Sequence, residues 1–189
     1  RNAFVHEGWV ALADIGLLQR ASASLPAADA IVVANVAGAT VHAGLQKLFA
    51  RWKAVPRWIA ATGAQCGVIS RYDDPTQLGA DRWAALIGAR QRVSGSCLVV
   101  NAGTAMTVDA LSKQGEFLGG IIVPGFELMH QGLVSNTAGL SSGQGSFSPF
   151  PRSTRDAIAS GAVQALCGGL EAAGVDHRAD IYALGVILY

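Results

Sequence analysis

The sequence has few charged residues, few cysteines and no long uninterrupted apolar run. Charged residues make up 14% of the 189 positions, well under the roughly 25% usual in soluble domains, so we expect a surface that is small and apolar or covered by a partner. The three cysteines are an odd number without C-x-x-C spacing, which argues against a disulfide framework or a zinc site. We therefore expect a cytoplasmic protein that associates with itself.

The same scarcity argues against two classes of partner. Fourteen basic and 13 acidic residues give a net charge of +1, and no run of lysines and arginines matches a row of phosphates. Asp29, Asn35, Asn101 and Asp109 interrupt the apolar stretches before they reach the roughly 18 residues of a membrane span. The first residues show no charged head followed by an apolar segment, so no export signal is expected. We expect neither nucleic acid nor membrane as a partner.

Hydrophobic residues, at 51%, suffice for a sizeable core, and their order predicts an α/β fold. The apolar run at 30–36 is of strand length, and apolar residues at helical spacing predict a helix at 41–52. Short strands are predicted at 9–13 and 57–61. Residues 63–79, rich in Gly, Asp and Pro, are predicted to form an ordered loop.

The middle of the chain predicts three antiparallel strands with helices around them. Short turns separate apolar segments at 98–102, 105–111 and 117–123, which is typical of consecutive hairpins. Pro124 suits the first turn of a helix, and Ser153-x-x-Asp156 is a capping box that opens another. Helices are predicted at 80–92, 124–134 and 153–173.

This βββα order suggests the ribonuclease H-like half that actin-like ATPases and sugar kinases use in duplicate. We therefore predict a duplicated ribonuclease H-like fold. Residues 1–62 would be the remainder of the first half. Residues 63–189 would form the second half and carry the substrate segment, a Gly-Thr turn and the C-terminal helices. This inference is an analogy of fold and does not yet concern chemistry.

Three segments of the sequence follow one another in a fixed order. They are Tyr72-x5-Leu78-Gly79-Ala80-Asp81-Arg82-Trp83, then Asn101-Ala102-Gly103-Thr104 to Asp109 with Gly119-Gly120-x-x-x-Pro124-Gly125, then Phe150-Pro151-Arg152-Ser153-Thr154-x-x-Ala157-Ile158-x-Ser160-Gly161. Together they resemble type III pantothenate kinase, and the resemblance covers about residues 67–169. It implies an actin-like fold, a homodimer and the ATP-dependent phosphorylation of the primary hydroxyl of pantothenate, the first step towards coenzyme A. The implied cofactors are ATP, Mg²⁺ and a monovalent cation, K⁺ or NH₄⁺.

The resemblance implies that Gly79, Ala80, Asp81 and Arg82 lie on pantothenate. Asp81 would be the general base for the hydroxyl proton, and since an ordinary carboxylate is a weak base for an alcohol, orientation would be its larger contribution. The residues alone leave alternatives open: Asp81 as a carboxylate at a helix N-terminus, Gly79 as a turn glycine, and Arg82 paired with a surface acid. The planar fork of Arg82 also matches the carboxylate of pantothenate.

Tyr72 and Thr154 complete the implied pantothenate site. Tyr72, nine residues before Asp81, occupies the position of the family's substrate-contacting tyrosine, although a half-buried loop tyrosine is the alternative. Thr154 matches the threonine that contacts pantothenate across the dimer. Ser153 or Thr154 is equally an obvious helix cap, and both roles are compatible.

The resemblance implies that Gly103-Thr104 and Asp109 lie where ATP binds. Backbone N–H groups and a hydroxyl in such a turn can meet a phosphate, and the family's threonine contacts ATP, although a plain hairpin needs only the glycine. Asp109 matches the carboxylate that holds the monovalent cation, with exposure at a sheet edge as the alternative. Asn101 stands where many members have Asp, which weakens a metal role there. Gly119-Gly120 is a bulge or a close-packed strand near the nucleotide.

Two pieces of the family pattern are not found in these residues, and both concern ATP. One is the phosphate loop of the form Asp-x-Gly-Asn-Thr, and the other is a Gly-Gly turn beside the adenosine. Residues 183–189 resemble the family's closing helix. We therefore expect these residues to be segments of a longer protein. Two alternatives stay open: a non-catalytic accessory or regulatory protein of the same fold, and an actin-like kinase with another acceptor.

Overall fold

The computed structural model describes residues 8, 10, 14–23, 25–137, 143–173 and 180–186. The chain divides into two compact units, residues 1–60 and 61–189, and each is described by itself. The predicted strand at 9–13 falls largely outside the described residues. No helix among the described residues is long and apolar enough to cross a membrane.

In the residues described for it, the first unit is a small parallel sheet with two helices. Two strands that run parallel need a crossover connection, and here a helix supplies it, with Ile31 paired to Pro56. The first strand is shorter than its apolar run because Asn35 turns the chain: its side chain accepts the N–H of Ala37 and donates to the carbonyl of Gly38, both at 3.0 Å. The elements are α1 (Ile15–Ala21), β1 (Ile31–Val33), α2 (Ala39–Phe49) and β2 (Pro56–Trp58).

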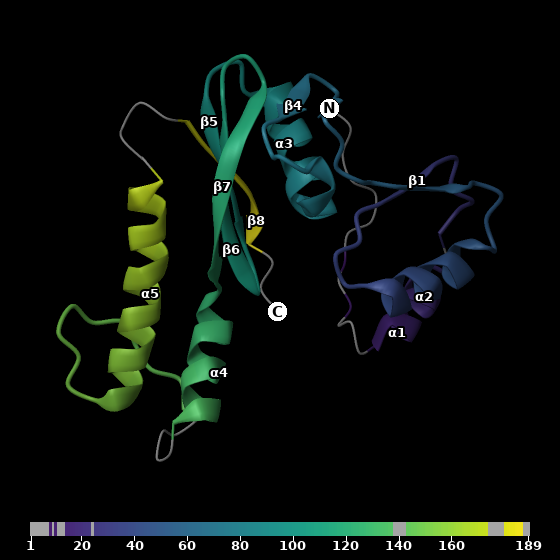
Figure 1. The fold of residues 1–189 in the computed structure, drawn as a ribbon. Helices are drawn as coiled ribbons and strands as arrows, with labels where there is room; N and C mark the ends of the chain where they lie inside the picture. Colours follow the sequence, from purple (N-terminus) through teal and green to yellow (C-terminus); the bar gives the residue numbers. More distant parts are fainter. Residues whose placement is uncertain are drawn as a thin grey trace. The chain divides into compact units, whose positions relative to one another are not determined.

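The second unit is a six-stranded sheet in the order β3-β4-β7-β6-β5-β8, with helices on both faces (Figure 1). Its centre is the predicted antiparallel meander β5-β6-β7, which β4 extends in parallel at one side and β8 extends in parallel at the other. The elements are β3 (Ala64–Gln65), β4 (Val68–Ser70), a 3₁₀ turn (Pro75–Gln77), α3 (Ala80–Arg92), β5 (Cys97–Ala102), β6 (Ala105–Leu111), β7 (Glu116–Pro124), α4 (Phe126–Asn136), α5 (Thr154–Ala172) and β8 (Asp180–Val186).

The two faces of the meander have separate cores because side chains alternate along a strand. Leu98, Met106 and Val108 point to one face, where Leu166 and Leu170 of α5 pack on them. On the α3 side, the helix buries the largest side chains of the unit, among them Trp83, Leu86 and Phe117. Odd-numbered residues of β6, including Asp109, therefore face α3.

The predicted capping box of α5 is confirmed. The hydroxyl of Ser153 accepts the backbone N–H of Asp156 at 3.2 Å and donates to the carboxylate of Asp156 at 2.7 Å. The N–H of Ser146 also donates to that carboxylate at 2.8 Å. These hydrogen bonds, that from Ser146 above all, lower the pKa of Asp156.

Three sequence-based expectations are corrected by the structure. Residues 63–79 are not a plain loop, because β3 and β4 form a hairpin whose turn residues, Cys66 and Gly67, adopt left-handed conformations with φ of 50° and 80°. Pro124 ends β7 and does not open a helix, since α4 begins at Phe126 after Gly125. Residues 180–186 pair with β5 as a strand, so they do not form the closing helix; residues 187–189 lie outside the described residues.

Candidate active site

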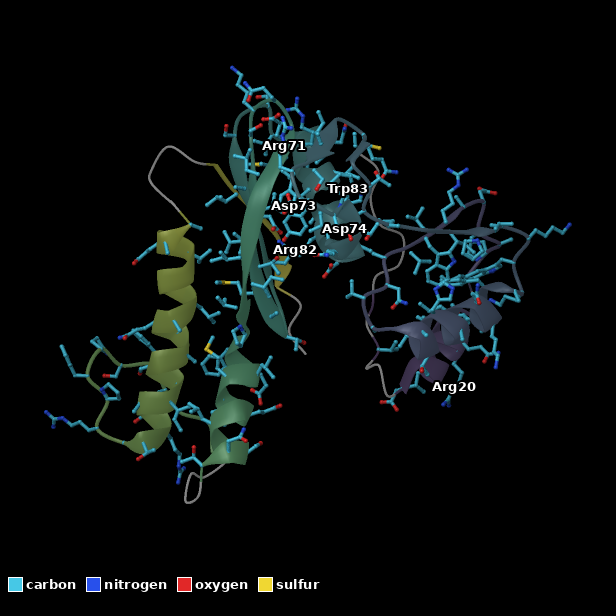
Figure 2. The ribbon with its side chains drawn as sticks, viewed as in Figure 1. Arg20, Arg71, Asp73, Asp74, Arg82 and Trp83 are labelled. Atoms are coloured by element: carbon cyan, nitrogen blue, oxygen red, sulfur yellow. The ribbon has the colours of Figure 1, made fainter. Side chains whose placement is uncertain are left out.

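A buried ion pair joins α3 to β6. Arg82 Nε lies 3.2 and 3.1 Å from the two carboxylate oxygens of Asp109, and Arg82 Nη2 also donates to Asp109 Oδ1. Arg82 is 5% exposed and Asp109 is fully buried. Helical spacing places Arg82 on the face of α3 that carries Leu86 and Ala89, and strand alternation turns Asp109 towards it. Figure 2 labels Arg82 where α3 meets the sheet. Two residues 27 positions apart thus form one site.

Burial and pairing act in opposite directions on the two charges. Burial raises the pKa of the Asp109 carboxyl, and the hydrogen bonds and charge of Arg82 work against this rise. The nearby charge of Asp81 adds to the rise. For Arg82, burial favours the neutral form, yet the bonds and charge of Asp109 leave the guanidinium pKa raised. Each residue compensates the burial of the other, and removing one partner of such a pair costs about 3–5 kcal/mol.

Two aromatic rings enclose the guanidinium. Arg82 Nη1 donates to the hydroxyl of Tyr72 at 3.3 Å. The rings of Tyr72 and Phe117 lie 5.1 Å apart, and the central guanidinium carbon is 5.9 Å from the centre of each. The backbone N–H of Tyr72 is tied to Ser70 Oγ at 3.2 Å. The structure therefore brings together Tyr72, Arg82 and Asp109 from three separate segments.

Gly120 lies directly opposite Asp109 on β7. A Cβ atom at this position would overlap Asp109 Oδ1 and would lie 2.6 Å from the carbonyl oxygen of Val108 and 3.0 Å from Arg82 Nη2. A bulge is one of the two alternatives for Gly119-Gly120, and the irregularity lies just before them: the β6–β7 register shifts between Phe117 and Gly119, and Gly119 has φ of 127°. Gly120 thus packs against the ion pair, a role that the sequence analysis missed and that only the strand register discloses.

Asp81 lies beside the ion pair in the first turn of α3 and is exposed. Its Oδ1 accepts the backbone N–H of Arg82 at 2.8 Å, which fits a carboxylate that complements the helix N-terminus. Gly79 precedes α3 with φ of −56°, a conformation that does not require glycine, and its carbonyl accepts the N–H of Trp83 at 3.0 Å. Ala80 is buried. The roles of all three on a substrate stay predictions.

The Gly103-Thr104 turn joins β5 to β6 and is held against the start of α4. The N–H of Gly125 donates to the carbonyl of Thr104 at 2.8 Å, and a Cβ at Gly125 would overlap the carbonyl oxygen of Gly103. The side chain of Thr104 is exposed. A fixed turn with an accessible hydroxyl is able to meet a phosphate, and this contact stays a prediction.

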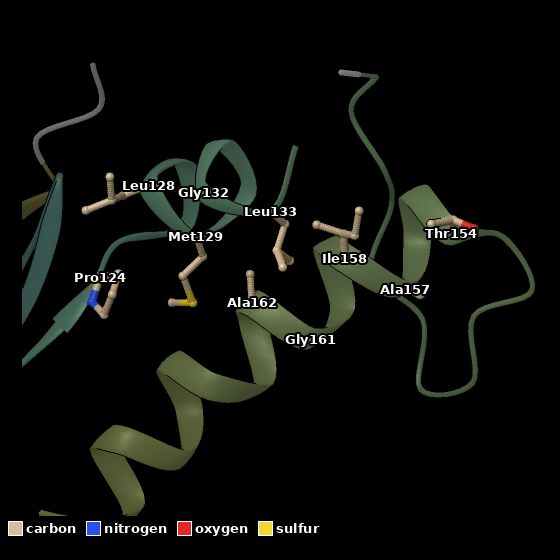
Figure 3. Close-up of a pocket in the computed structure, with 10 residues that line it drawn as sticks. All are labelled: Pro124, Leu128, Met129, Gly132, Leu133, Thr154, Ala157, Ile158, Gly161 and Ala162. Carbon is tan, nitrogen blue, oxygen red and sulfur yellow. The ribbon is translucent and has the colours of Figure 1, made fainter. Parts of the chain in front are cut away.

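Thr154 is not brought to Arg82. It opens α5, which packs on the other face of the meander from α3, and it lines a groove of about 780 Å³ between α4 and α5 (Figure 3). The walls of the groove are apolar. Its lining comprises Pro124, Leu128, Met129, Gly132, Leu133, Thr154, Ala157, Ile158, Gly161 and Ala162.

The surroundings of Asp109 do not fit the predicted monovalent cation. Both of its oxygens already accept hydrogen bonds from Arg82, whose positive charge balances the carboxylate. The amide of Asn101 donates to Thr107 Oγ1 at 3.3 Å. Among the described residues no three His, Cys, Asp or Glu side chains lie together around Asp109 or elsewhere. The cation role of Asp109 therefore finds no support in its geometry.

Comparison with known proteins gives one family. A family model described as type III pantothenate kinase matches residues 10–174. Proteins named type III pantothenate kinase include one from Nitrosospira multiformis, 50% identical over 165 residues, and one from Nitrosomonas eutropha, 52% identical over 157 residues. The matches cover 87% and 82% of this chain, but only 63% and 61% of those proteins. The chain thus spans a little over three fifths of their length.

Solved structures with a similar fold include that of a conserved Campylobacter jejuni protein named for the Baf family of transcriptional activators, with a TM-score of 0.55 and 23% sequence identity. The match covers 89% of this chain and 71% of the Campylobacter chain. At this identity the likeness concerns the fold alone.

Replacing Gly120 by Ala tests the packing of the ion pair. We expect Gly120→Ala to lower the free energy of unfolding by about 1–3 kcal/mol, because the added methyl group overlaps Asp109 Oδ1. The matched control is Gly168→Ala in α5, where a Cβ meets nothing within 4 Å and helix propensity favours Ala by up to about 1 kcal/mol. Urea unfolding measures both; equal stability of Gly120→Ala and the parent protein would contradict the packing described here.

Proposed function

Because the chain belongs to the type III pantothenate kinase family, we propose that the protein phosphorylates the primary hydroxyl of pantothenate with ATP, the first step towards coenzyme A. The observation that carries this proposal is the exposed carboxylate of Asp81 beside the buried, oriented guanidinium of Arg82. Pantothenate has a hydroxyl at one end and a carboxylate at the other, and the two side chains complement these groups. All of these residues lie inside the matched range.

Asp81 accepts the proton of the pantothenate hydroxyl in this proposal. The hydrogen bond from the N–H of Arg82 holds its carboxylate in one orientation. Because a carboxylate is a weak base for an alcohol, the proton moves late, when the bond between the transferred phosphoryl group and the departing ADP is largely broken. Orienting the hydroxyl towards the phosphoryl group is then the larger contribution of Asp81.

Arg82 and Tyr72 hold the other end of the substrate. A guanidinium has five N–H groups in a planar fork, and the bonds to Asp109 and Tyr72 use three of them. The remaining two, on Nη1 and Nη2, bind the pantothenate carboxylate. Gly79 and Ala80, which begin the same helix, place their backbone against the substrate.

In the part of the site that would bind ATP, the hydroxyl of Thr104 contacts a phosphate, and Gly103 lies against the same phosphate with its N–H held by the carbonyl of Ala105 at 3.1 Å. When bound, ATP supplies the phosphoryl group, with Mg²⁺ on its phosphates. We keep a monovalent cation, K⁺ or NH₄⁺, as a cofactor of the proposed reaction and assign it no ligand among the described residues.

The low cysteine content supports a cytoplasmic location.

We also propose that the two units belong to a duplicated ribonuclease H-like fold, with residues 1–62 as the remainder of the first half and 63–189 as the second. The β5-β6-β7 meander extended by a parallel β8 supports this assignment.

We further propose that the protein is a homodimer whose two copies meet at the α4–α5 groove. Low charge and half-exposed apolar side chains such as Leu128 and Leu133 in the groove support it. Thr154 would then reach pantothenate bound to the partner.

Substituting Asp81 tests the chemistry. We expect Asp81→Asn to lower kcat by about 10²- to 10⁴-fold, because the base is lost, while calorimetry shows little change in pantothenate binding. Glu171→Gln, an exposed acidic residue on α5, is the matched control and keeps the parent rate. The assay follows phosphorylated pantothenate formed by the full-length protein with ATP and Mg²⁺. Unchanged kcat in Asp81→Asn would refute the assigned base, and pantothenate binding without turnover in the parent protein would favour the non-catalytic alternative.

A charge in the groove tests the dimer. Ile158→Glu places a carboxylate among apolar groups, so we expect monomers by sedimentation velocity and, if Thr154 acts across the interface, weaker pantothenate binding. Val55→Glu is the control, since Val55 is 82% exposed in the first unit. Identical sedimentation of Ile158→Glu and the parent protein would contradict this interface.

A further inference from the structure

Arg82 and Asp109 have separate roles in the family pattern, yet in the structure they bind each other. The resemblance implies that Arg82 meets the substrate and that Asp109 meets a cation. Instead, the Nε and Nη2 side of the guanidinium faces both oxygens of Asp109, and the two residues are buried together. The contact with Arg82 is therefore the observation from which a role for Asp109 follows.

We infer that Asp109 and Gly120 are positioning residues, which fix the guanidinium of Arg82 so that its outer N–H groups face the carboxylate of the substrate. This inference rests on the proposed function and adds two residues to it. Neither residue touches the substrate in this account. Asp109 acts through its two hydrogen-bonded oxygens, and Gly120 acts through the space that its missing side chain leaves.

The direction of the fork follows from its bonds. Asp109 occupies Nε and one hydrogen of Nη2, and Tyr72 occupies one hydrogen of Nη1. Within the part of the chain that the structure describes, one N–H on each terminal nitrogen is left. Nη1 and Nη2 together form the end of the fork, which is the edge that matches a carboxylate. A lysine could not replace this arrangement, because its ammonium has no second edge.

Gly120 provides both the fit and the access. It is exposed, and a Cβ there would overlap Asp109 Oδ1 and lie 3.0 Å from Arg82 Nη2. Any larger residue would therefore push Asp109 away from the fork and cover the terminal nitrogen at the same time. The glycine opposite Asp109 places no side chain over Arg82 Nη2, and in this inference the substrate carboxylate approaches the guanidinium there, although the arginine as a whole is 5% exposed.

Preorganisation explains why such a pair would serve binding. An arginine side chain free in solvent has to be ordered when a ligand binds, and this ordering lowers affinity. Asp109, Tyr72 and Phe117 impose that order in advance. Because Asp109 also balances the charge of Arg82, the guanidinium stays buried without a ligand. Loss of Asp109 should therefore weaken substrate binding and leave the response to a monovalent cation unchanged.

The experiment measures two constants in the full-length protein: the KM for pantothenate, and the potassium concentration that gives half-maximal activity at constant ionic strength. In Asp109→Asn we expect the KM for pantothenate to rise about 10- to 100-fold, with a smaller change in kcat and with the potassium constant of the parent protein. Asp109→Glu, which keeps the charge, should recover part of the KM. Glu171→Gln should match the parent protein in both constants.

A second variant keeps the test decisive if Asp109→Asn folds poorly. Arg82→Met/Asp109→Leu removes both charges, so we expect a Tm near that of the parent protein and pantothenate binding, measured by calorimetry, that stays weak. Parent-like binding in this double variant would overturn the inference. So would an unchanged KM in Asp109→Asn, or a raised potassium constant with an unchanged KM, which would make Asp109 the cation ligand. A parent protein that neither binds nor phosphorylates pantothenate would overturn the proposed function and this inference together.

Discussion

A charge buried in a protein needs a partner, and the pairing of Arg82 with Asp109 is the constraint around which the second unit is arranged. Their contact fixes the face of α3 that meets the sheet and the side of β6 that meets α3. It also requires glycine at position 120, because β7 must approach the carboxylate closely. The aromatic rings of Tyr72 and Phe117 then enclose the guanidinium. The proposed substrate binding thus depends on an ion pair around which α3 and the sheet are packed.

Much of the fold could be predicted from local sequence. Apolar alternation and short turns predicted the β5–β7 meander, helical spacing predicted α3 at 80–92, and the Ser153 capping box predicted the start of α5. The failures have physical causes. The Cys66-Gly67 turn has none of the usual Asn-Gly chemistry, and the end of β7 at Pro124 depends on a hydrogen bond from Gly125 to Thr104. The strand at 180–186 exists through pairing with β5, which is a long-range contact.

The candidate site was predictable in its members but not in its connections. Tyr72, Asp81, Arg82 and Asp109 were each identified through the family resemblance, yet no local pattern predicts that Arg82 binds Asp109. That contact depends on the packing of α3 against the sheet and on the register that sets Asp109 opposite Gly120. For the same reason the role of Gly120 was invisible in the sequence. Asp109 thus matches a cation ligand in the family pattern, whereas in the structure it contacts Arg82.

In the proposed function, the oriented guanidinium of Arg82 recognises the carboxylate of pantothenate. Calorimetric titration with pantothenate and with its alcohol analogue, in which a hydroxymethyl group replaces the carboxylate, tests this recognition most directly. A hydrogen bond to a charged group contributes about 1.5–3 kcal/mol, so we expect pantothenate to bind about 10- to 100-fold more tightly than the alcohol, and Arg82→Met/Asp109→Leu to lose this preference. Equal affinity of the parent protein for the two ligands would show that Arg82 does not recognise the carboxylate.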